Sequence, residues 1–239
     1  MSSKDQNGCG MILYEPSNEQ SDSMIVLLHG GPHNCFAACY TPDILFYVHQ
    51  KYTVLVPNYH GSFGAGDAFL HSLCGHIGDI EIRDVLDSIE TALRARPSLS
   101  PDSLYLMGSS YGGFIGMKLL QTRPTLFRYA ILRNGVFDTV TMLTASDMSS
   151  WMLVLAGIIP SRGEPTEKTR MVLRGQYVYS LEDLQRIYAV NPIREMEKVE
   201  TPICFILGGK DCRVVNQQTF EAYRLLRSYG RDVESSLGW

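Results

Sequence analysis

One serine stands in a sequence pattern that is typical of a nucleophile. The segment Gly108-Ser109-Ser110-Tyr111-Gly112 matches G-x-S-x-G, with an apolar run before it and a helical pattern after it. On such a strand-to-helix turn the hydroxyl is exposed, the glycines leave room for the bend, and the helix start favours negative charge. The pattern predicts that Ser110 is the nucleophile of a hydrolase. A glycine-rich turn without chemistry is the alternative reading of these five residues alone.

A second glycine-rich segment, His29-Gly30-Gly31-Pro32-His33, follows an apolar run earlier in the chain. Acyl transfer needs backbone N–H groups that stabilise the developing oxyanion, one from the residue after the nucleophile and one from such a loop. We assign these roles to Tyr111 and Gly31. We expect His29 and His33 to fix the loop by hydrogen bonds rather than to act as catalytic bases. A plain turn is the alternative for the glycines.

An acid and a histidine would complete the catalytic triad, in the chain order serine, acid, histidine. Asp211 lies just past a late apolar run, where the acid belongs, and would orient the imidazole. Asp138, after an earlier run, is the second candidate, and a solvated turn aspartate is the alternative for Asp211. The histidines all precede Ser110; they are His29, His33, His49, His60, His71 and His76. We therefore expect an incomplete domain that ends before its histidine.

Short apolar runs alternate with helical patterns, which predicts a mostly parallel, doubly wound α/β sheet with crossover helices. Buried strands are expected at 24–28, 53–56, 104–107, 129–132 and 203–207, with an antiparallel strand at 11–14. Helices are expected at 82–93, 112–123 and 181–190, and a last helix ends near Gly230. Asp79 is expected to cap the first of them. Residues 142–178 are expected to form a cap-side excursion with a short helix around Trp151.

Composition narrows the class of protein. The 239 residues suit a single domain, and 45% of them are hydrophobic, enough for a substantial core. The formal net charge is −4 and the basic residues are scattered, which argues against nucleic-acid binding. No stretch is long and apolar enough for a membrane span, and the first residues lack an apolar signal region. We expect a cytoplasmic protein without a membrane partner, with residues 1–10 disordered.

Taken together, these residues resemble the catalytic domain of the prolyl oligopeptidase family, and within it the acylaminoacyl-peptidases. The segment Pro57-Asn58-Tyr59-His60-Gly61-Ser62-Phe63-Gly64 and the segment Gly209-Lys210-Asp211-Cys212-Arg213-Val214 are typical of the whole family. The region from Arg133-Asn134 to Ala156-Gly157 is similar to the acylaminoacyl-peptidases in particular. The resemblance implies an α/β-hydrolase fold and release of an N-acylated amino acid from a short peptide through Ser110. It implies no metal or organic cofactor, and many members form homo-oligomers.

The chain also departs from the family pattern. No N-terminal β-propeller is expected in it, and His60 stands where an arginine is usual. The family's histidine lies one strand and a loop beyond the final helix, where residues 235–239 stand here. We therefore expect the last strand, the histidine loop and the closing helix to be missing, the sheet edge to be exposed, and the activity to be very low.

Two further functions fit the same residues. A small-molecule carboxylesterase would use the same nucleophile in an open site. A catalytically dead peptide-binding or oligomerisation module would keep the fold without the chemistry, and would not react with a fluorophosphonate at Ser110.

Overall fold

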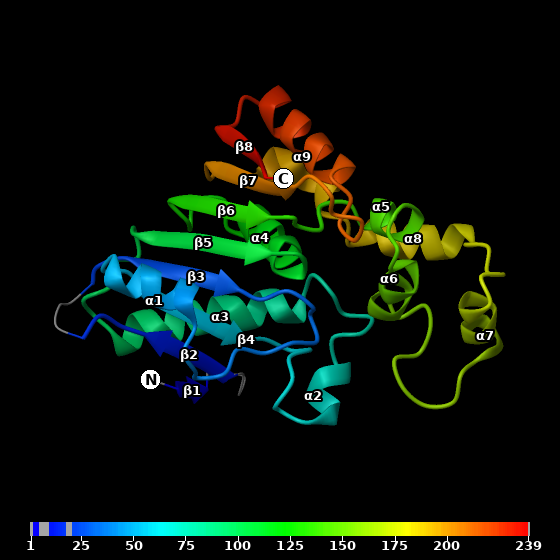
Figure 1. Ribbon diagram of the computed structural model, residues 1–239, viewed down its shortest axis with the longest axis horizontal. Coiled ribbons are helices and arrows are strands. Elements are labelled where there is room, and N and C mark those ends of the chain that lie inside the picture. The colour runs from blue at the N-terminus through cyan, green and yellow to red at the C-terminus, as the bar shows by residue number, and fades with distance from the viewer. Residues whose placement is uncertain (1, 5–9, 18–20, 239) are drawn as a thin grey trace.

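The computed structural model describes residues 2–4, 10–17 and 21–238. The strands among these residues form one eight-stranded sheet, and helices lie on both of its faces (Figure 1). The spatial order of the strands is β1-β2-β4-β3-β5-β6-β7-β8. Their bounds are β1 Ser2–Lys4, β2 Gly10–Tyr14, β3 Met24–Leu28, β4 Thr53–Asn58, β5 Leu104–Ser109, β6 Tyr129–Arg133, β7 Ile203–Gly208 and β8 Val233–Gly238. Strands β3 to β8 run parallel, whereas β2 is antiparallel to β4 and β1 to β2. The predicted parallel sheet and the antiparallel strand at 11–14 are therefore confirmed.

The two ends of the sheet differ from the expectation. Ser2–Lys4 forms β1, although we expected disorder over residues 1–10; residues 1 and 5–9 lie outside the described part. The expectation of a missing last strand is wrong, because Val233–Gly238 forms β8 and pairs with β7 along its whole length. In β8 only Val233 is buried, so the run lacks the apolar character of a buried parallel strand. The sheet edge thus lies one strand further along than expected.

The helices have the following bounds: α1 Pro42–His49, α2 Asp67–His71, α3 Ile80–Ala95, α4 Tyr111–Thr122, α5 Thr139–Thr144, α6 Ser149–Leu155, α7 Glu167–Leu173, α8 Leu181–Ala189, the 3-10 segment η1 Pro192–Lys198, and α9 Gln217–Ser228. The four longer helices expected from the sequence and the short helix around Trp151 are confirmed. Asp79 does precede α3, but its carboxylate makes no cap hydrogen bond and pairs instead with Arg83. None of the described helices is both long and apolar enough to cross a bilayer.

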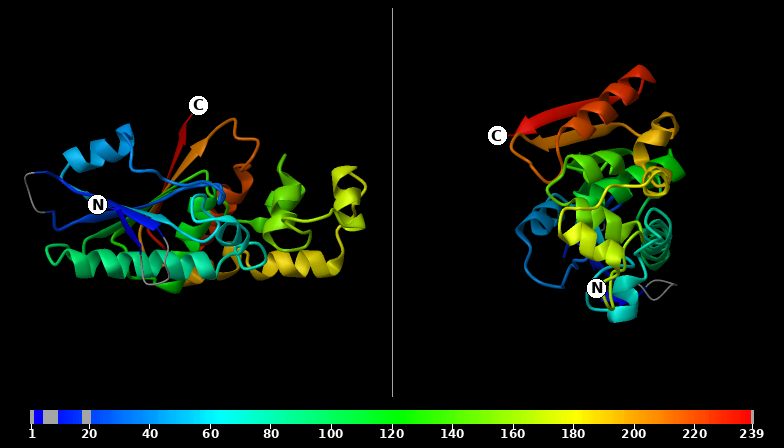
Figure 2. Two further views of the ribbon diagram at one scale, coloured as in Figure 1. Left: turned by 90° about the horizontal axis from the view of Figure 1, so that it is seen from below. Right: turned by 90° about the vertical axis from the view of Figure 1, so that its right-hand side faces the viewer.

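The helices cover the two faces of the sheet unequally. Helices α3 and α4 pack on one face, and α9 packs there against β7 and β8. Helix α1 lies on the opposite face, over β4 (Figure 2). Along β5 and β7 every second residue is only half-buried, and these positions face the α1 side. A parallel sheet is usually buried on both faces, so the α1 side of these strands is left partly open.

The helices α5 to α8 lie beyond the carboxyl ends of the strands (Figure 1). This α5–α8 excursion contains the cap-side segment expected at 142–178, but it begins at Thr139 and also includes α8. Helix α4 begins at the same end of the sheet, directly after β5. The carboxyl ends of parallel strands are where ligands bind in α/β folds. The catalytic candidates must therefore be sought between this end of the sheet and the α5–α8 excursion.

Candidate active site

Ser110 forms the turn between β5 and α4 in a strained backbone conformation. Its φ is 58° and its ψ is −121°, in a region that residues other than glycine rarely occupy. The turn is held by the Ser110 N–H, which donates to the carbonyl of Arg133 at 3.1 Å, and by the Gly113 N–H, which donates to the Ser110 carbonyl at 2.9 Å. Strain of this kind persists only where the surrounding structure fixes it, and it is common at active sites.

Gly108 and Gly112, on either side of Ser110, have no room for a side chain. A Cβ atom on Gly108 would lie 2.3 Å from the carbonyl oxygen of Gly112. A Cβ on Gly112 would lie 2.4 Å from the carbonyl oxygen of Leu28. Helix α4 therefore starts in direct contact with the end of β3, which brings the loop after β3 next to the serine.

That loop places the glycine pair beside Ser110. A Cβ on Gly30 would lie 3.1 Å from the Ser110 Cβ and 3.6 Å from its hydroxyl oxygen. Gly31 has a φ of +119°, which a residue with a side chain rarely adopts. Across the described residues, the N–H groups of Gly31 and Tyr111 have no hydrogen-bond partner. Both are thus free to bind a negatively charged oxygen.

His29 holds the loop from within the core. Its Nε2 lies 2.9 Å from the Ser62 hydroxyl, and its ring stacks on Tyr59, whose hydroxyl donates to the His29 carbonyl at 2.6 Å. Burial lowers the pKa of His29 to about 4, so the ring is neutral near pH 7. His33 bonds the carbonyl of Gly61 through Nδ1 at 2.9 Å. Both histidines therefore fix the loop, as the sequence predicts.

Two residues that sequence reasoning missed hold Tyr111 and Gly31, the candidates for binding the oxyanion. The buried Tyr111 ring donates its hydroxyl to Glu81 Oε1 at 2.8 Å. The Trp151 indole N–H donates to the carbonyl of Gly31 at 3.1 Å, and its ring meets that of Tyr111 edge-on. Trp151 thus contacts both Gly31 and Tyr111. The sequence signal for Trp151 was an indole ring with an N–H donor on a helix expected near the site. For Glu81 the only signal was a carboxyl group on the apolar face of α3.

Glu81 is a fully buried carboxyl group with incomplete hydrogen bonding. Its Oε1 accepts from the Gly78 N–H at 2.6 Å and from the Tyr111 hydroxyl, while Oε2 finds no partner among the residues that the structure describes. Burial raises its pKa above the ordinary 4.5, more than the hydrogen bonds lower it. The carboxyl group therefore sits beneath the nucleophile turn in a site that disfavours its charge.

Asp211 lies at the end of β7, in a turn that reaches the serine's surroundings. Its Oδ1 accepts from the N–H groups of Arg213 at 2.9 Å and Val214 at 3.0 Å. Arg213 and Val214 line a hollow of about 350 Å³ together with Ser110, Gly31 and Trp151. The alternative acid, Asp138, is committed elsewhere: it caps α5 by accepting from the Val140 N–H and it accepts from the Asn191 amide at 2.6 Å.

No base contacts the nucleophile in the described part of the chain. The Ser110 hydroxyl has no hydrogen-bond partner there, and no histidine follows Asp211 in the sequence. His60 bonds Asp84 Oδ2 through Nδ1 at 2.7 Å and stacks on Phe69. No group of three metal-ligating side chains is found among the described residues.

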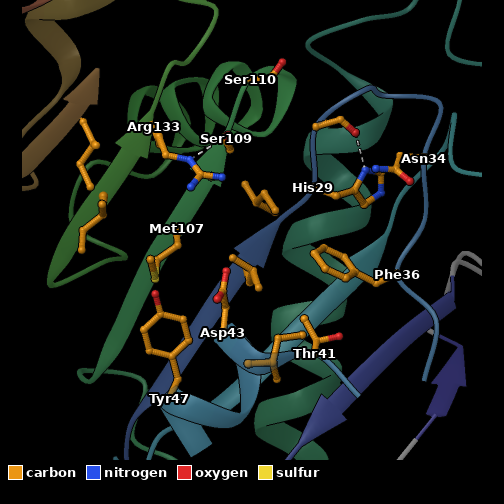
Figure 3. A pocket seen from close by; sticks show the side chains of 17 residues that line it. His29, Asn34, Phe36, Thr41, Asp43, Tyr47, Met107, Ser109, Ser110 and Arg133 are labelled. Carbon is orange, nitrogen blue, oxygen red and sulfur yellow. Dashed lines mark hydrogen bonds between the residues drawn. The ribbon is translucent and has the colours of Figure 1, made fainter. Parts of the chain in front are cut away.

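A second hollow opens on the α1 side of Ser110, with a volume of about 430 Å³. Figure 3 shows Ser109, Ser110 and Arg133 at one end of it and Tyr47 of α1 towards the other. The Arg133 Nε donates to the Ser109 hydroxyl at 3.4 Å. Ser110 therefore separates two hollows, one below the α5–α8 excursion and one along the open face of the sheet.

Comparison with known proteins shows the family to which this chain belongs. A sequence profile of the prolyl oligopeptidase family matches residues 40–237. Among curated proteins, the acylamino-acid-releasing enzyme of Arabidopsis thaliana is 31% identical over 217 residues, and that of Mus musculus is 30% identical over 220 residues. Each alignment covers 91% of this chain but only 27% and 28% of the relative. The chain thus spans little more than a quarter of the length of these relatives.

Solved structures agree on the fold. An acylaminoacyl peptidase of Pyrococcus horikoshii superposes with a TM-score of 0.83 at 20% identity, covering all of this chain and 36% of that one. A puromycin-hydrolyzing peptidase of Mycobacterium tuberculosis gives a TM-score of 0.82 at 18% identity, covering all of this chain and 35% of that one. At such low identity the likeness shows the fold alone, which is the expected α/β-hydrolase.

Proposed function

Because this chain belongs to the prolyl oligopeptidase family, we propose that it carries the catalytic serine of an acylaminoacyl-peptidase-like hydrolase. Ser110 attacks the carbonyl of an N-acylated amino-acid residue at the start of a short peptide. The N–H groups of Gly31 and Tyr111 bind the oxyanion. Asp211 stands where a triad acid would orient a histidine, although no histidine follows Asp211 in the sequence. A base, which added imidazole can supply, takes the Ser110 proton and passes it to the amine as the carbon–nitrogen bond breaks. Water then hydrolyses the acyl ester of Ser110.

The observation that carries this proposal is the combination of a strained serine with two unused N–H donors. Ser110 adopts a positive φ beside Gly30, while Gly31 and Tyr111 offer N–H groups without partners in the described residues. Donors fixed in advance need no rearrangement as negative charge develops, and one such donor is worth roughly 10²–10³ in turnover. A turn without chemistry has no need of this arrangement.

The hollow below the α5–α8 excursion supports an acyl-amino-acid substrate. Val136, Met142, Met148 and Trp151 give it apolar walls next to Ser110, while Arg213 adds a positive charge. An apolar amino-acid side chain fits such walls. The relatives that this sequence matches are acylamino-acid-releasing enzymes, which supports an N-acyl group on the substrate. A cytoplasmic location and association of identical copies belong to the same proposal.

The rate of substrate turnover depends on a base that takes the proton from the Ser110 hydroxyl. Without a histidine, triad serines retain only the part of catalysis that the oxyanion hole and binding supply, roughly 10³–10⁴ over water. The hollow on the α1 side reaches Ser110 and is large enough to admit a free imidazole molecule. Added imidazole can therefore serve as the base for this chain.

The test follows release of p-nitroaniline from N-acetyl-alanine p-nitroanilide by the wild type and by Ser110→Ala, with and without imidazole. We expect slow release that imidazole accelerates in the wild type and leaves unchanged in the variant. Equal rates for the two proteins under both conditions would reject the hydrolase. Turnover of a plain short-chain ester far above that of the anilide would instead favour the carboxylesterase.

A further inference from the structure

A second serine–histidine–aspartate arrangement lies away from Ser110, between α2 and the loop that follows α6. The Ser161 hydroxyl lies 3.1 Å from His71 Nδ1, and His71 Nε2 lies 3.2 Å from Asp67 Oδ1. We propose that Ser161 is a second reactive serine, which His71 and Asp67 activate towards small esters with good leaving groups. None of these three residues lines either hollow beside Ser110.

The hydrogen bonds define which nitrogen of His71 acts as the base. Asp67 can only accept when ionised, so the Nε2 proton of His71 points to it. Nδ1 is then the unprotonated nitrogen and accepts from the Ser161 hydroxyl. The remaining oxygen of Asp67 accepts from Arg162 Nη1 at 2.8 Å, which holds the carboxylate in place. This order of donors matches that of a base-activated hydroxyl.

Sequence and packing explain why the three groups meet. Asp67 and His71 are four residues apart on α2, so their side chains share one face. Ser161 comes from the loop after α6. This loop contacts the turn that follows α2, at Gly75. The Gly75 N–H donates to the Leu155 carbonyl at 2.8 Å, and a Cβ on Gly157 would lie 2.9 Å from the Gly75 Cα. The close backbone contact fixes Ser161 over the helix.

An open hollow of about 330 Å³ gives a small molecule access to the hydroxyl, and His71, Cys74, Ile159, Ser161 and Arg162 are among the residues that line it. This is at the lower end of the sizes found for small-molecule sites. The His71 side chain is only 20% exposed, so its ring is partly shielded from water. Cys74 also contacts Ser161, but burial raises the pKa of its thiol and keeps it neutral and weakly nucleophilic.

The reaction balances without any further group. The Ser161 oxygen attacks the carbonyl carbon of an aryl ester while its proton passes to His71 Nδ1. The bond from the acyl carbon to the aryl oxygen breaks, the aryloxide departs, and the proton on His71 neutralises it. The product is an ester of Ser161. A fluorophosphonate reacts in the same way, with fluoride as the leaving group.

The test uses the Ser110→Ala chain, so that labelling at Ser161 is independent of the proposed hydrolase site. The chain is treated with a fluorophosphonate, and the adducts are mapped by mass spectrometry. We expect an adduct on Ser161 that forms faster than any on Ser150, an exposed serine of α6. His71→Gln should slow it about 100-fold and Asp67→Asn roughly tenfold or more, because each removes part of the base.

Cys74→Ala should leave the labelling of Ser161 unchanged. Thermal melts of all variants check that each protein still folds. Asp67→Asn is the more conservative test, because asparagine keeps the shape of the aspartate side chain whereas glutamine changes that of histidine. No adduct on Ser161, a rate equal to that of Ser150, an adduct on Cys74 instead, or a rate unaffected by Asp67→Asn in folded protein would overturn the proposal.

Discussion

The Trp151 indole N–H donates a hydrogen bond of 3.1 Å to the carbonyl oxygen of Gly31. The same indole ring meets Tyr111 edge-on, with the ring centroids 6.0 Å apart. One side chain of the α5–α8 excursion therefore touches both residues whose N–H groups are proposed to bind the oxyanion. Trp151 therefore lines the hollow below the excursion and also contacts both residues of the proposed oxyanion site.

Trp151→Phe should weaken the oxyanion site without emptying the hollow. The variant keeps an aromatic ring but loses a hydrogen bond worth about 1 kcal/mol. We expect acylation of Ser110 by N-acetyl-alanine p-nitrophenyl ester to slow by about three- to tenfold, with little change in the half-saturating concentration. The matched control is Tyr179→Phe, which loses a hydrogen bond to the Leu143 carbonyl in the same excursion. An equal effect of the two substitutions would contradict a specific role for Trp151.

Gly112→Ala should destabilise the fold through steric clash. The new methyl group would lie 2.4 Å from the Leu28 carbonyl oxygen, so β3 or α4 must move. We expect a loss of about 2 kcal/mol or more in the free energy of unfolding, measured with urea. Gly10→Ala is the control, because its nearest neighbour would be 3.8 Å away, and we expect a change within about 0.5 kcal/mol. Similar losses for both variants would show that α4 does not start against β3.

His29 should make the protein less stable in mild acid. Its pKa is lowered from 6.5 to about 4 by burial, so between these values the unfolded chain binds a proton that the folded chain does not. Stability is lost as the pH falls through this window. Between pH 7 and pH 5 the wild type should lose about 2 kcal/mol relative to His29→Gln, whose side chain does not titrate. Parallel losses in the two proteins would mean that His29 is exposed or charged.

Glu81 should act in the opposite direction. Burial raises its pKa above 4.5, so above that pH the folded chain holds a proton that the unfolded chain has released. Its contribution to stability is therefore fully present below about pH 4.5 and is lost as the pH rises through the folded pKa. The free energy of unfolding of the wild type, compared with that of Glu81→Gln by urea titration, should fall with rising pH. A difference that grows with pH would show that Glu81 is stabilised as an anion.

The sequence predicted the parts of the structure that depend on local patterns. Runs such as 24–28 and 104–107 are apolar and became parallel strands in the middle of the sheet. The turn at Ser110 could be predicted because glycine is needed where a Cβ would strike backbone. The strand β8 was missed because an edge strand with five exposed residues needs no apolar run. The roles of Glu81 and Trp151 arise from contacts 30 and 120 residues apart in the chain, which no local pattern encodes.

The most direct test of the account is the acylation of Ser110. Incubation with N-acetyl-alanine p-nitrophenyl ester should leave one acetyl-alanyl group on the peptide that contains Ser110, because deacylation is slow without a base. The group should be absent from that peptide in Ser110→Ala, and mass spectrometry of the digested protein detects both results. A folded wild-type chain whose Ser110 gains no acyl group, even with imidazole present, would contradict the claim that this serine is a nucleophile.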